Sequence, residues 1–248
     1  MSGHSKWSSI KHKKAATDAK RSKLWAKLLR AVEVAARDGG GIVANNPTLA
    51  SAVQSAKDVS VPSDNIDRAI KRGTGEIEGA HYEEVVYEGY GPGGVAILVN
   101  ALTDNRNRTS ADVRNVFSKR GGNLGDPGSV SFLFHRTGVI RVARSEVDEE
   151  RLLDLILEAG AEDLSEDGDE WEVRTEPQAL PGAREAIEGA AIPIASAEVT
   201  MLPQTTVPVE GSQARSVLGL IEALDDLDDV QAVYANFDIP EELFAEVG

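Results

Sequence analysis

The side chains best placed to do chemistry are the lysines and arginines gathered in the first 37 residues. This stretch holds ten Lys or Arg against two acids, whereas residues 76–248 hold twelve against thirty-five. The formal net charge of the whole chain is −15 at pH 7. Nucleic acids present closely spaced phosphates, and cations that neutralise them release condensed counterions. A basic end on an otherwise acidic chain therefore predicts an arm that binds nucleic acid.

Two ring side chains, Trp7 and His12, stand among the lysines of this arm. Flat rings beside cations stack on unpaired bases, which favours RNA. A long basic helix face instead suits the groove of a DNA duplex, so the pattern leaves DNA and RNA both open. The candidate nucleic-acid-binding residues of this region are Lys6, Trp7, Lys11, His12, Lys13, Lys14, Lys20, Arg21, Lys23, Lys27 and Arg30.

Two other interpretations fit the same charges. The basic stripe could be an ordinary solvated helix face behind a tail without a ligand. The basic module could also dock on the chain's own acidic lobes, or on those of a neighbouring protein, because opposite charges orient such contacts.

A second cationic stretch, TDNRNRT, lies at a predicted strand-to-helix junction. The first amides of a helix have no partner inside it, and with arginines beside them they suit an anion such as phosphate. Thr103 or Asp104 is expected to cap this helix. The alternative is a solvent loop whose Asn and Asp side chains satisfy the turn. The candidate residues here are Asn105, Arg106, Asn107 and Arg108.

Catalytic and cofactor motifs are weak or missing from the sequence. The four histidines have no partner at metal-ligand spacing, and neither H-E-x-x-H nor G-x-S-x-G occurs. GYGPGG at 89–94 matches a dinucleotide fingerprint by letter, but it leads into a predicted strand and is expected to be a hairpin turn. The acidic runs at 166–170 and 225–229 are expected to be a tight turn and a solvated helix end, the latter also suited to a protein partner. We therefore predict no enzyme activity, no cofactor, no metal and no small-molecule substrate.

The sequence also bears on where the protein acts. No apolar run approaches the ~20 residues that span a bilayer, and the basic start has no apolar stretch behind it. There is no cysteine, which fits a reducing compartment. We expect a cytoplasmic protein that binds no membrane.

The elements that must position these residues begin with three helices, at 15–38, 46–59 and 63–73. In the first helix, the apolar Leu24, Leu28 and Val32 fall on one side and the cations on the other. Asn46 and Pro47 start the second helix as cap and first turn. Short connections predict a three-helix bundle.

The rest of the chain alternates between strands and helices. Strands are expected at 83–87, 95–102 and 129–135, with a helix at 107–119. A βαββαβ cycle, the ferredoxin-like order, follows at 139–143, 149–159, 161–164, 171–175, 180–190 and 194–201. A strand at 204–209, a helix at 212–224 and a strand at 230–237 end the pattern.

The fold class expected is α+β: an amino-terminal three-helix bundle plus two α/β modules, one ferredoxin-like and inserted in the other. The predicted domains are 1–77, a discontinuous α/β domain of 78–136 and 204–248, and the inserted 137–203. Three consecutive domains are the alternative.

Several segments resemble the YebC/PmpR family across essentially the whole chain. They are GHSKWSSIKHKKAATDAKRSK, PSDNIDRAIKRGTGE, YEGYGPGGVAILV, TDNRNRTSADVRNVFSKRGGNLGDPGSVSFLF and LDDLDDVQAVYANFD. The resemblance implies three domains and a cytoplasmic regulator without catalysis. It implies a DNA-binding transcriptional regulator or, as the alternative, an RNA- or ribosome-associated translation factor that promotes translation or relieves stalling. Mitochondrial members of the family activate translation of a cytochrome oxidase subunit, and some bacterial members resemble ribosome-associated factors that relieve stalling. The positions that match by motif are His4, Lys6, Trp7, Ile10, Lys11, His12, Lys14, Lys20, Arg21, Lys27 and Asn105 to Thr109.

Overall fold

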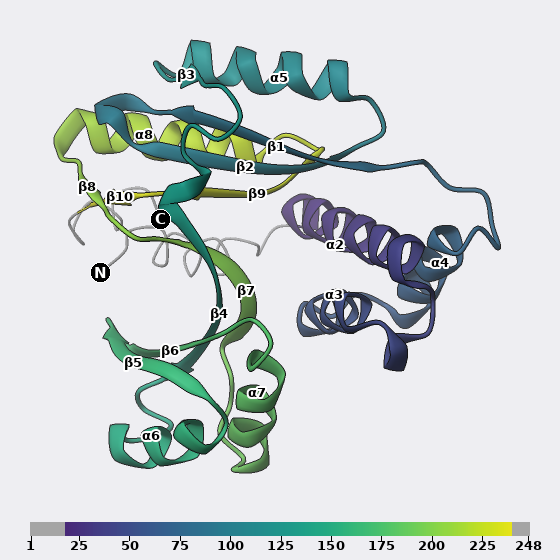
Figure 1. Cartoon of the computed structure of the whole chain (residues 1–248), viewed down its shortest axis with the longest axis vertical. Coiled ribbons are helices and arrows are strands. Elements are labelled where there is room, and N and C mark those ends of the chain that lie inside the picture. Colours follow the sequence, from purple (N-terminus) through teal and green to yellow (C-terminus); the bar gives the residue numbers. More distant parts are fainter. Residues whose placement is uncertain (1–17, 240–248) are drawn as a thin grey trace. The chain divides into compact units, whose positions relative to one another are not determined.

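The computed structural model describes residues 18–239 (Figure 1). Phe134–Gln204 forms one compact unit, and the described segments before and after it, ending at Leu133 and resuming at Thr205, form the other. The fold class is α+β: a helical domain of three helices is followed by mixed α/β domains with two antiparallel sheets. The domain limits 1–77, 78–136 with 204–248, and 137–203 stay predictions.

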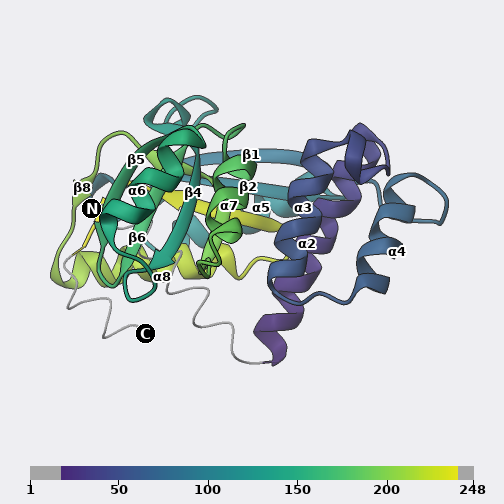
Figure 2. The same cartoon turned by 90° about the horizontal axis from the view of Figure 1, so that it is seen from below.

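The helical domain consists of α2 (Asp18–Gly39), α3 (Pro47–Asp58) and α4 (Ser63–Gly73), which pack together (Figures 1 and 2). Its helix limits agree with the sequence prediction over the described residues. The predicted cap is confirmed, because the Asn46 side chain accepts a hydrogen bond from the Leu49 N–H at 3.0 Å. The same amide donates to the carbonyl of Ala35 at 2.8 Å, so one buried side chain joins the end of α2 to the start of α3.

The core of this domain is small and apolar. Its fully buried members come from all three helices, with Val32 on α2, Leu49 on α3 and Ala69 on α4. Trp25 packs at its edge and donates from its indole N–H to the Val59 carbonyl at 3.1 Å. The predicted apolar stripes therefore do form the core of the bundle.

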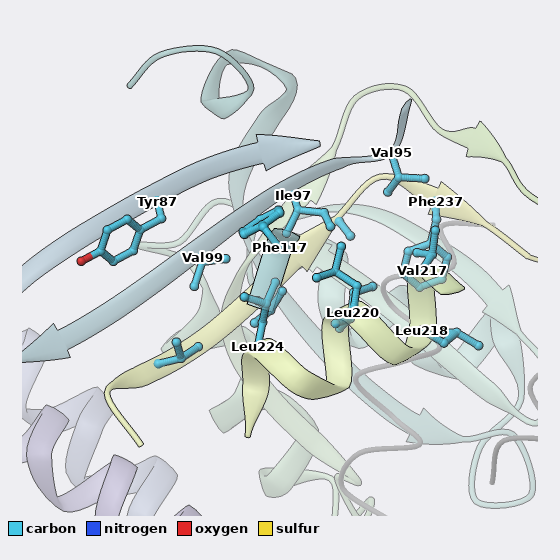
Figure 3. Packing of buried hydrophobic residues seen from close by; sticks show 14 of the residues in the cluster. Tyr87, Val95, Ile97, Val99, Phe117, Val217, Leu218, Leu220, Leu224 and Phe237 are labelled. Atoms are coloured by element: carbon cyan, nitrogen blue, oxygen red, sulfur yellow. The ribbon is translucent and has the colours of Figure 1, made fainter. Parts of the chain in front are cut away.

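The first sheet has the order β3-β1-β2-β9 and is antiparallel throughout. Its strands are β1 (Glu83–Tyr90), β2 (Ala96–Thr103), β3 (Asn123–Leu124) and β9 (Val230–Ala235). Helices α5 (Arg106–Lys119) and α8 (Gly211–Asp225) pack against it with one shared apolar core. Figure 3 shows Ile97 of β2, Phe117 of α5 and Leu220 of α8 meeting in this core.

The segment GYGPGG is a hairpin turn between β1 and β2, as predicted. Gly93 and Gly94 have φ of 75° and 78°, which side chains with a Cβ rarely adopt. The turn closes with the Gly91 N–H donating to the Val95 carbonyl at 2.8 Å. The chain then enters a strand, so these glycines do not open a helix as a dinucleotide fingerprint requires.

The strand predicted at 129–135 is wrong for residues 129–133. Residues Ser131–Leu133 form a short 3-10 helix, and β4 (Phe134–Ala143) begins only afterwards and runs without a break. The cause is the buried carboxylate of Glu88, which accepts hydrogen bonds at 2.7 Å from the backbone N–H groups of Gly128, Val130 and Ser131. Those donors are therefore not free to form a strand ladder.

Of the strand predicted at 204–209, only β8 (Val207–Pro208) is a strand in the structure. It pairs in parallel with β10 (Phe237–Asp238). Pro208 has no N–H to extend the pairing. The predicted strand 230–237 is divided into β9 and β10 at Asn236, whose side chain accepts from the Ala96 N–H at 2.7 Å.

The unit Phe134–Gln204 has the predicted βαββαβ order of elements. They are β4, α6 (Glu149–Glu158), β5 (Ala161–Asp167), β6 (Glu170–Thr175), α7 (Leu180–Gly189) and β7 (Ser196–Pro203). The antiparallel sheet order is β5-β6-β4-β7. The acidic run at 166–170 is the predicted tight turn, with Gly168 at φ 64° between β5 and β6.

Candidate nucleic-acid interface

Six of the predicted nucleic-acid-binding residues lie outside the described residues, and their role stays a prediction. They are Lys6, Trp7, Lys11, His12, Lys13 and Lys14. The structure therefore bears on the candidates of α2 and of the loop before α5.

The first cations of α2 lie at its surface. Lys20 is exposed and has no ion pair within residues 18–239. The guanidinium of Arg21 lies 5.8 Å from the centre of the Trp25 ring, an arrangement in which the ring attracts the cation. Lys20 is thus the α2 candidate best placed to meet an external anion.

The next three cations of α2 contact an acidic segment far along the chain, Asp225–Asp229, which begins at the last residue of α8. The Lys23 ammonium lies 3.7 Å from carboxylate oxygens of both Asp226 and Asp228. The Lys27 ammonium lies 3.4 Å from the Asp225 carboxylate, and its residue is only 8% exposed. The expectation that the whole basic stripe faces outward is therefore wrong for Lys27.

These cations also bind carbonyl oxygens that α8 leaves without a helical partner. Lys23 donates to the Asp226 carbonyl and Lys27 to the Asp225 carbonyl, both at 2.6 Å. The last carbonyls of a helix carry a partial negative charge, which cations stabilise. The prediction of a solvated helix end is therefore wrong for Asp225, whose side chain is 22% exposed, and agrees with the structure for Asp226, whose side chain is 71% exposed.

The loop before α5 begins with a different cap from the one predicted. The side chain of Asn105, not that of Thr103 or Asp104, accepts a hydrogen bond from the Arg108 N–H at 3.1 Å. The Thr103 hydroxyl instead accepts a hydrogen bond from the Asn105 N–H at 2.9 Å. The capping residue is therefore Asn105, one position after Asp104. Arg106 and Asn107 are exposed, and Arg106 has no ion pair in the part of the chain described.

Arg108 is held by two carboxylates. Its guanidinium lies 2.8 Å from Asp104 and 2.7 Å from Asp229. Hydrogen bonds to Asp229 and Asp104 raise the pKa of Arg108 above its usual value, so it stays charged under all ordinary conditions.

Asp229 joins the two candidate elements. One carboxylate oxygen accepts from the Thr109 hydroxyl at 2.6 Å and from Arg108 at 2.7 Å, and the other lies 3.3 Å from the Arg30 guanidinium. Burial alone would raise the pKa of Asp229, but the hydrogen bonds from Thr109 and Arg108 and the nearby cations lower it below its usual value. Arg30 of α2 and Arg108 of α5 thus meet at one ionised side chain.

The sequence pattern left docking of the basic module on the chain's own acidic lobes open as an alternative, but it did not identify the aspartate run at 225–229 as the partner. It also missed a cationic group on the outer face of α4. Arg68, Lys71 and Arg72 are exposed and make no ion pair among residues 18–239, although Asp64 and Asp67 stand on the same helix. Their spacing of three and four residues places them on one helix face.

Among residues 18–239, no group of three or more His, Asp or Glu side chains is placed to hold a metal ion. No helix of that same range is long and apolar enough to cross a membrane.

Comparison with known proteins places the whole chain in one group. The model of the TACO1/YebC protein N-terminal domain matches residues 5–76, and the model of the TACO1/YebC second and third domain matches residues 82–237. A probable transcriptional regulatory protein of Rubrobacter xylanophilus is 57% identical over 248 residues, covering 100% of this chain and 99% of that protein. Another, of Desulforapulum autotrophicum, is 54% identical over 98% of this chain and 99% of its own.

A solved structure is also similar. The crystal structure of a conserved hypothetical protein from Aquifex aeolicus matches with a TM-score of 0.83 and 49% identity. The match covers 93% of this chain and 95% of the Aquifex chain.

Proposed function

Because this chain belongs to the TACO1/YebC family, whose relatives are named probable transcriptional regulatory proteins, we propose that it is a nucleic-acid-binding regulator of gene expression that acts on transcription by binding DNA. The observation that carries the proposal is the cationic start of the chain, with ten Lys or Arg against two acids in 37 residues of a chain with net charge −15. Such a charge distribution directs the basic end toward a polyphosphate and keeps the acidic remainder away from it.

Exposed cations of the described residues support this proposal. Lys20 on α2 and Arg106 at the start of α5 make no ion pair among residues 18–239, so an arriving phosphate displaces no carboxylate from them. The backbone N–H groups of the first turn of α5 lie beside Arg106 and, apart from that of Arg108, which Asn105 caps, add donors suited to an anion. Lys6, Lys11, Lys13 and Lys14 add further cations to the same part of the sequence.

A second candidate function is an RNA- or ribosome-associated translation factor that promotes translation or relieves stalling. The observation that favours it is the position of Trp7 and His12 among lysines, because ring stacking suits unpaired bases. Both candidates share the cationic site and differ in the nucleic acid that it meets.

The proposal includes the remaining predictions about partners and organisation. The protein has no catalytic role, takes no cofactor or small-molecule substrate, and acts in the cytoplasm. A protein partner on the acidic lobes is compatible with either candidate. Phe134–Gln204 is a ferredoxin-like domain inserted into the other α/β domain, which the strand order β5-β6-β4-β7 supports.

The experiment that separates the candidates is crosslinking in living cells, followed by sequencing of the DNA and RNA recovered from one sample. Enrichment of promoter DNA is expected for the transcriptional role, and enrichment of ribosomal or messenger RNA would replace it with the translational one. If neither is enriched, and the purified protein also ignores DNA, RNA and ribosomes at low ionic strength, nucleic-acid binding itself is refuted.

A further inference from the structure

Four cations that could meet phosphate are already held by the acidic segment Asp225–Asp229. We propose that Lys23, Arg30 and Arg108 form a single phosphodiester-binding site, which the acidic segment occupies as an intramolecular competitor of nucleic acid. This inference rests on the proposed function and adds its regulation. Lys27, which is 8% exposed, anchors the segment rather than meeting the ligand.

The geometry of the three cations supports one site rather than three. Arg30 and Arg108 approach different oxygens of the same Asp229 carboxylate, at 3.3 and 2.7 Å. Arg30 also donates to the Asp228 carbonyl at 2.9 Å, and Lys23 lies 3.7 Å from the Asp228 carboxylate. The cations therefore surround two consecutive residues of the segment.

The groups that fill the site resemble the oxygens of a phosphodiester backbone. The segment presents carboxylate and carbonyl oxygens in succession. Lys23 and Arg30 each contact at least two of them, and Arg108 contacts one. Guanidinium groups bind carboxylates and phosphates in the same planar geometry, so a side chain that fits one accepts the other. A phosphate chain could replace the segment without a new set of protein donors.

The contact is also one that an external anion can open. The side chains of Lys23, Asp226 and Asp228 are 45%, 71% and 80% exposed, and ion pairs at such exposure contribute little to stability. The apolar core of the helical domain and that of the first sheet are separate clusters. The contacts between the α2 cations and the acidic segment are therefore polar and are not part of an apolar core. Arg30 adds a contact with the Tyr82 ring, 4.8 Å away, and a hydrogen bond to the Leu102 carbonyl.

The acidic segment and a phosphate cannot share the site. Four aspartates within five residues would lie beside the arriving phosphate, and like charges at such separations repel. Binding therefore requires the exposed Asp226 and Asp228 to move away, while the buried Asp229 keeps its contacts with Thr109 and Arg108. Neutralising this part of the segment should strengthen binding even though no cation is added.

The test is the variant Asp225→Asn, Asp226→Asn, Asp228→Asn, which keeps the buried Asp229 and its contacts. Its dissociation constants for a fluorescein-labelled mixed-sequence duplex DNA and for a single-stranded RNA of equal length are compared with those of the wild-type chain at low salt. We expect affinity for at least one probe to rise by about tenfold or more, which corresponds to about 1.4 kcal/mol.

The matched control removes the same charge elsewhere. Asp154→Asn, Glu158→Gln, Glu162→Gln changes three exposed acids of the Phe134–Gln204 unit that make no ion pair within residues 18–239. If the control variant gains as much affinity for the probes as the test variant, the effect comes from net charge and the proposal that the acidic segment competes with nucleic acid is wrong. Unchanged or weaker binding by a test variant that unfolds at the wild-type temperature would also overturn it.

The proposed function has its own separate outcome. If the wild-type chain binds neither probe but the test variant binds one, the result supports the proposal that the acidic segment competes with nucleic acid. It then also shows that the segment blocks the site in the wild-type chain. If the wild-type chain binds and the test variant gains nothing, only the competitor fails. If neither protein binds any probe, the proposed function fails and this inference fails with it.

Discussion

Replacing Asp229 by Ala should destabilise the fold because this carboxylate joins three segments of the chain. Its residue is 9% exposed, and it accepts a 2.6 Å hydrogen bond from the Thr109 hydroxyl, itself buried. A hydrogen bond to a charged group contributes about 1.5–3 kcal/mol. The guanidinium contacts add little, because Arg108 reaches solvent and Arg30 keeps two carbonyl partners. We therefore expect a loss of about 2–3 kcal/mol.

The measurement is urea unfolding followed by circular dichroism, with thermal unfolding beside it. A loss of this size should lower Tm by about 5–10 °C for a chain of this length. The matched control is Asp226→Ala, in the same segment but with a side chain 71% exposed, for which a change within about 0.5 kcal/mol is expected. Equal effects of the two substitutions would refute the reasoning that burial and the Thr109 hydrogen bond decide the contribution.

The pH dependence of the same difference provides a second check. Because the pKa of Asp229 is lowered in the folded state, its charge stabilises the fold above the unfolded pKa, which is about 3.9 for Asp. That stabilisation is lost as the pH falls from there through the folded-state pKa. The gap between the wild-type chain and Asp229→Ala should therefore be complete at neutral pH and narrow in acid. A gap that stays constant down to the acid transition would contradict the charged state.

Three further predictions follow from other parts of the chain. Glu88→Gln should cost about 2–3 kcal/mol in urea unfolding, because an amide NH2 would face backbone N–H donors now held at 2.7 Å; a wild-type midpoint would refute the role of its carboxylate. Arg106→Ala should weaken nucleic-acid binding and leave Tm unchanged, whereas Arg114→Ala, also exposed on α5, should change neither; equal affinities of the two would make Arg106 a turn residue only. On duplex DNA, contact with about five phosphates should give a slope near −4 for log affinity against log salt, and a flat response would exclude a phosphate-based site.

Local signals in the sequence were sufficient to predict most elements. Asn46 followed by Pro47 predicted the start of α3 because capping is decided by neighbouring residues. The hydrophobic pattern over Phe134–Gln204 predicted its order of strands and helices, because this pattern is also set by residues near one another in the sequence. The cap of α5 was misplaced by one or two residues, since four polar residues in a row each suit that position.

What the sequence could not predict depends on contacts between distant segments. Residues 129–133 were predicted to be part of a strand but do not form one. The carboxylate of Glu88, about forty residues away, accepts hydrogen bonds from backbone N–H groups that strand pairing would need. The pattern of α2 predicted an outward cationic face. It did not reveal that Lys27 binds Asp225, because the two residues are 198 positions apart in the sequence. Charge in the sequence therefore indicated the chemistry of the site, but not which cations the chain had already paired with its own acids.

The joining of α2 to Asp229 has a consequence for the order in which the protein is made. Synthesis proceeds from the amino terminus, and domains generally fold as they emerge. The helical domain has its own apolar core, whereas the aspartates that hold its cations arrive almost two hundred residues later. A newly emerging helical domain therefore carries Lys23, Lys27 and Arg30 without their acidic partners while the chain is still attached to the ribosome.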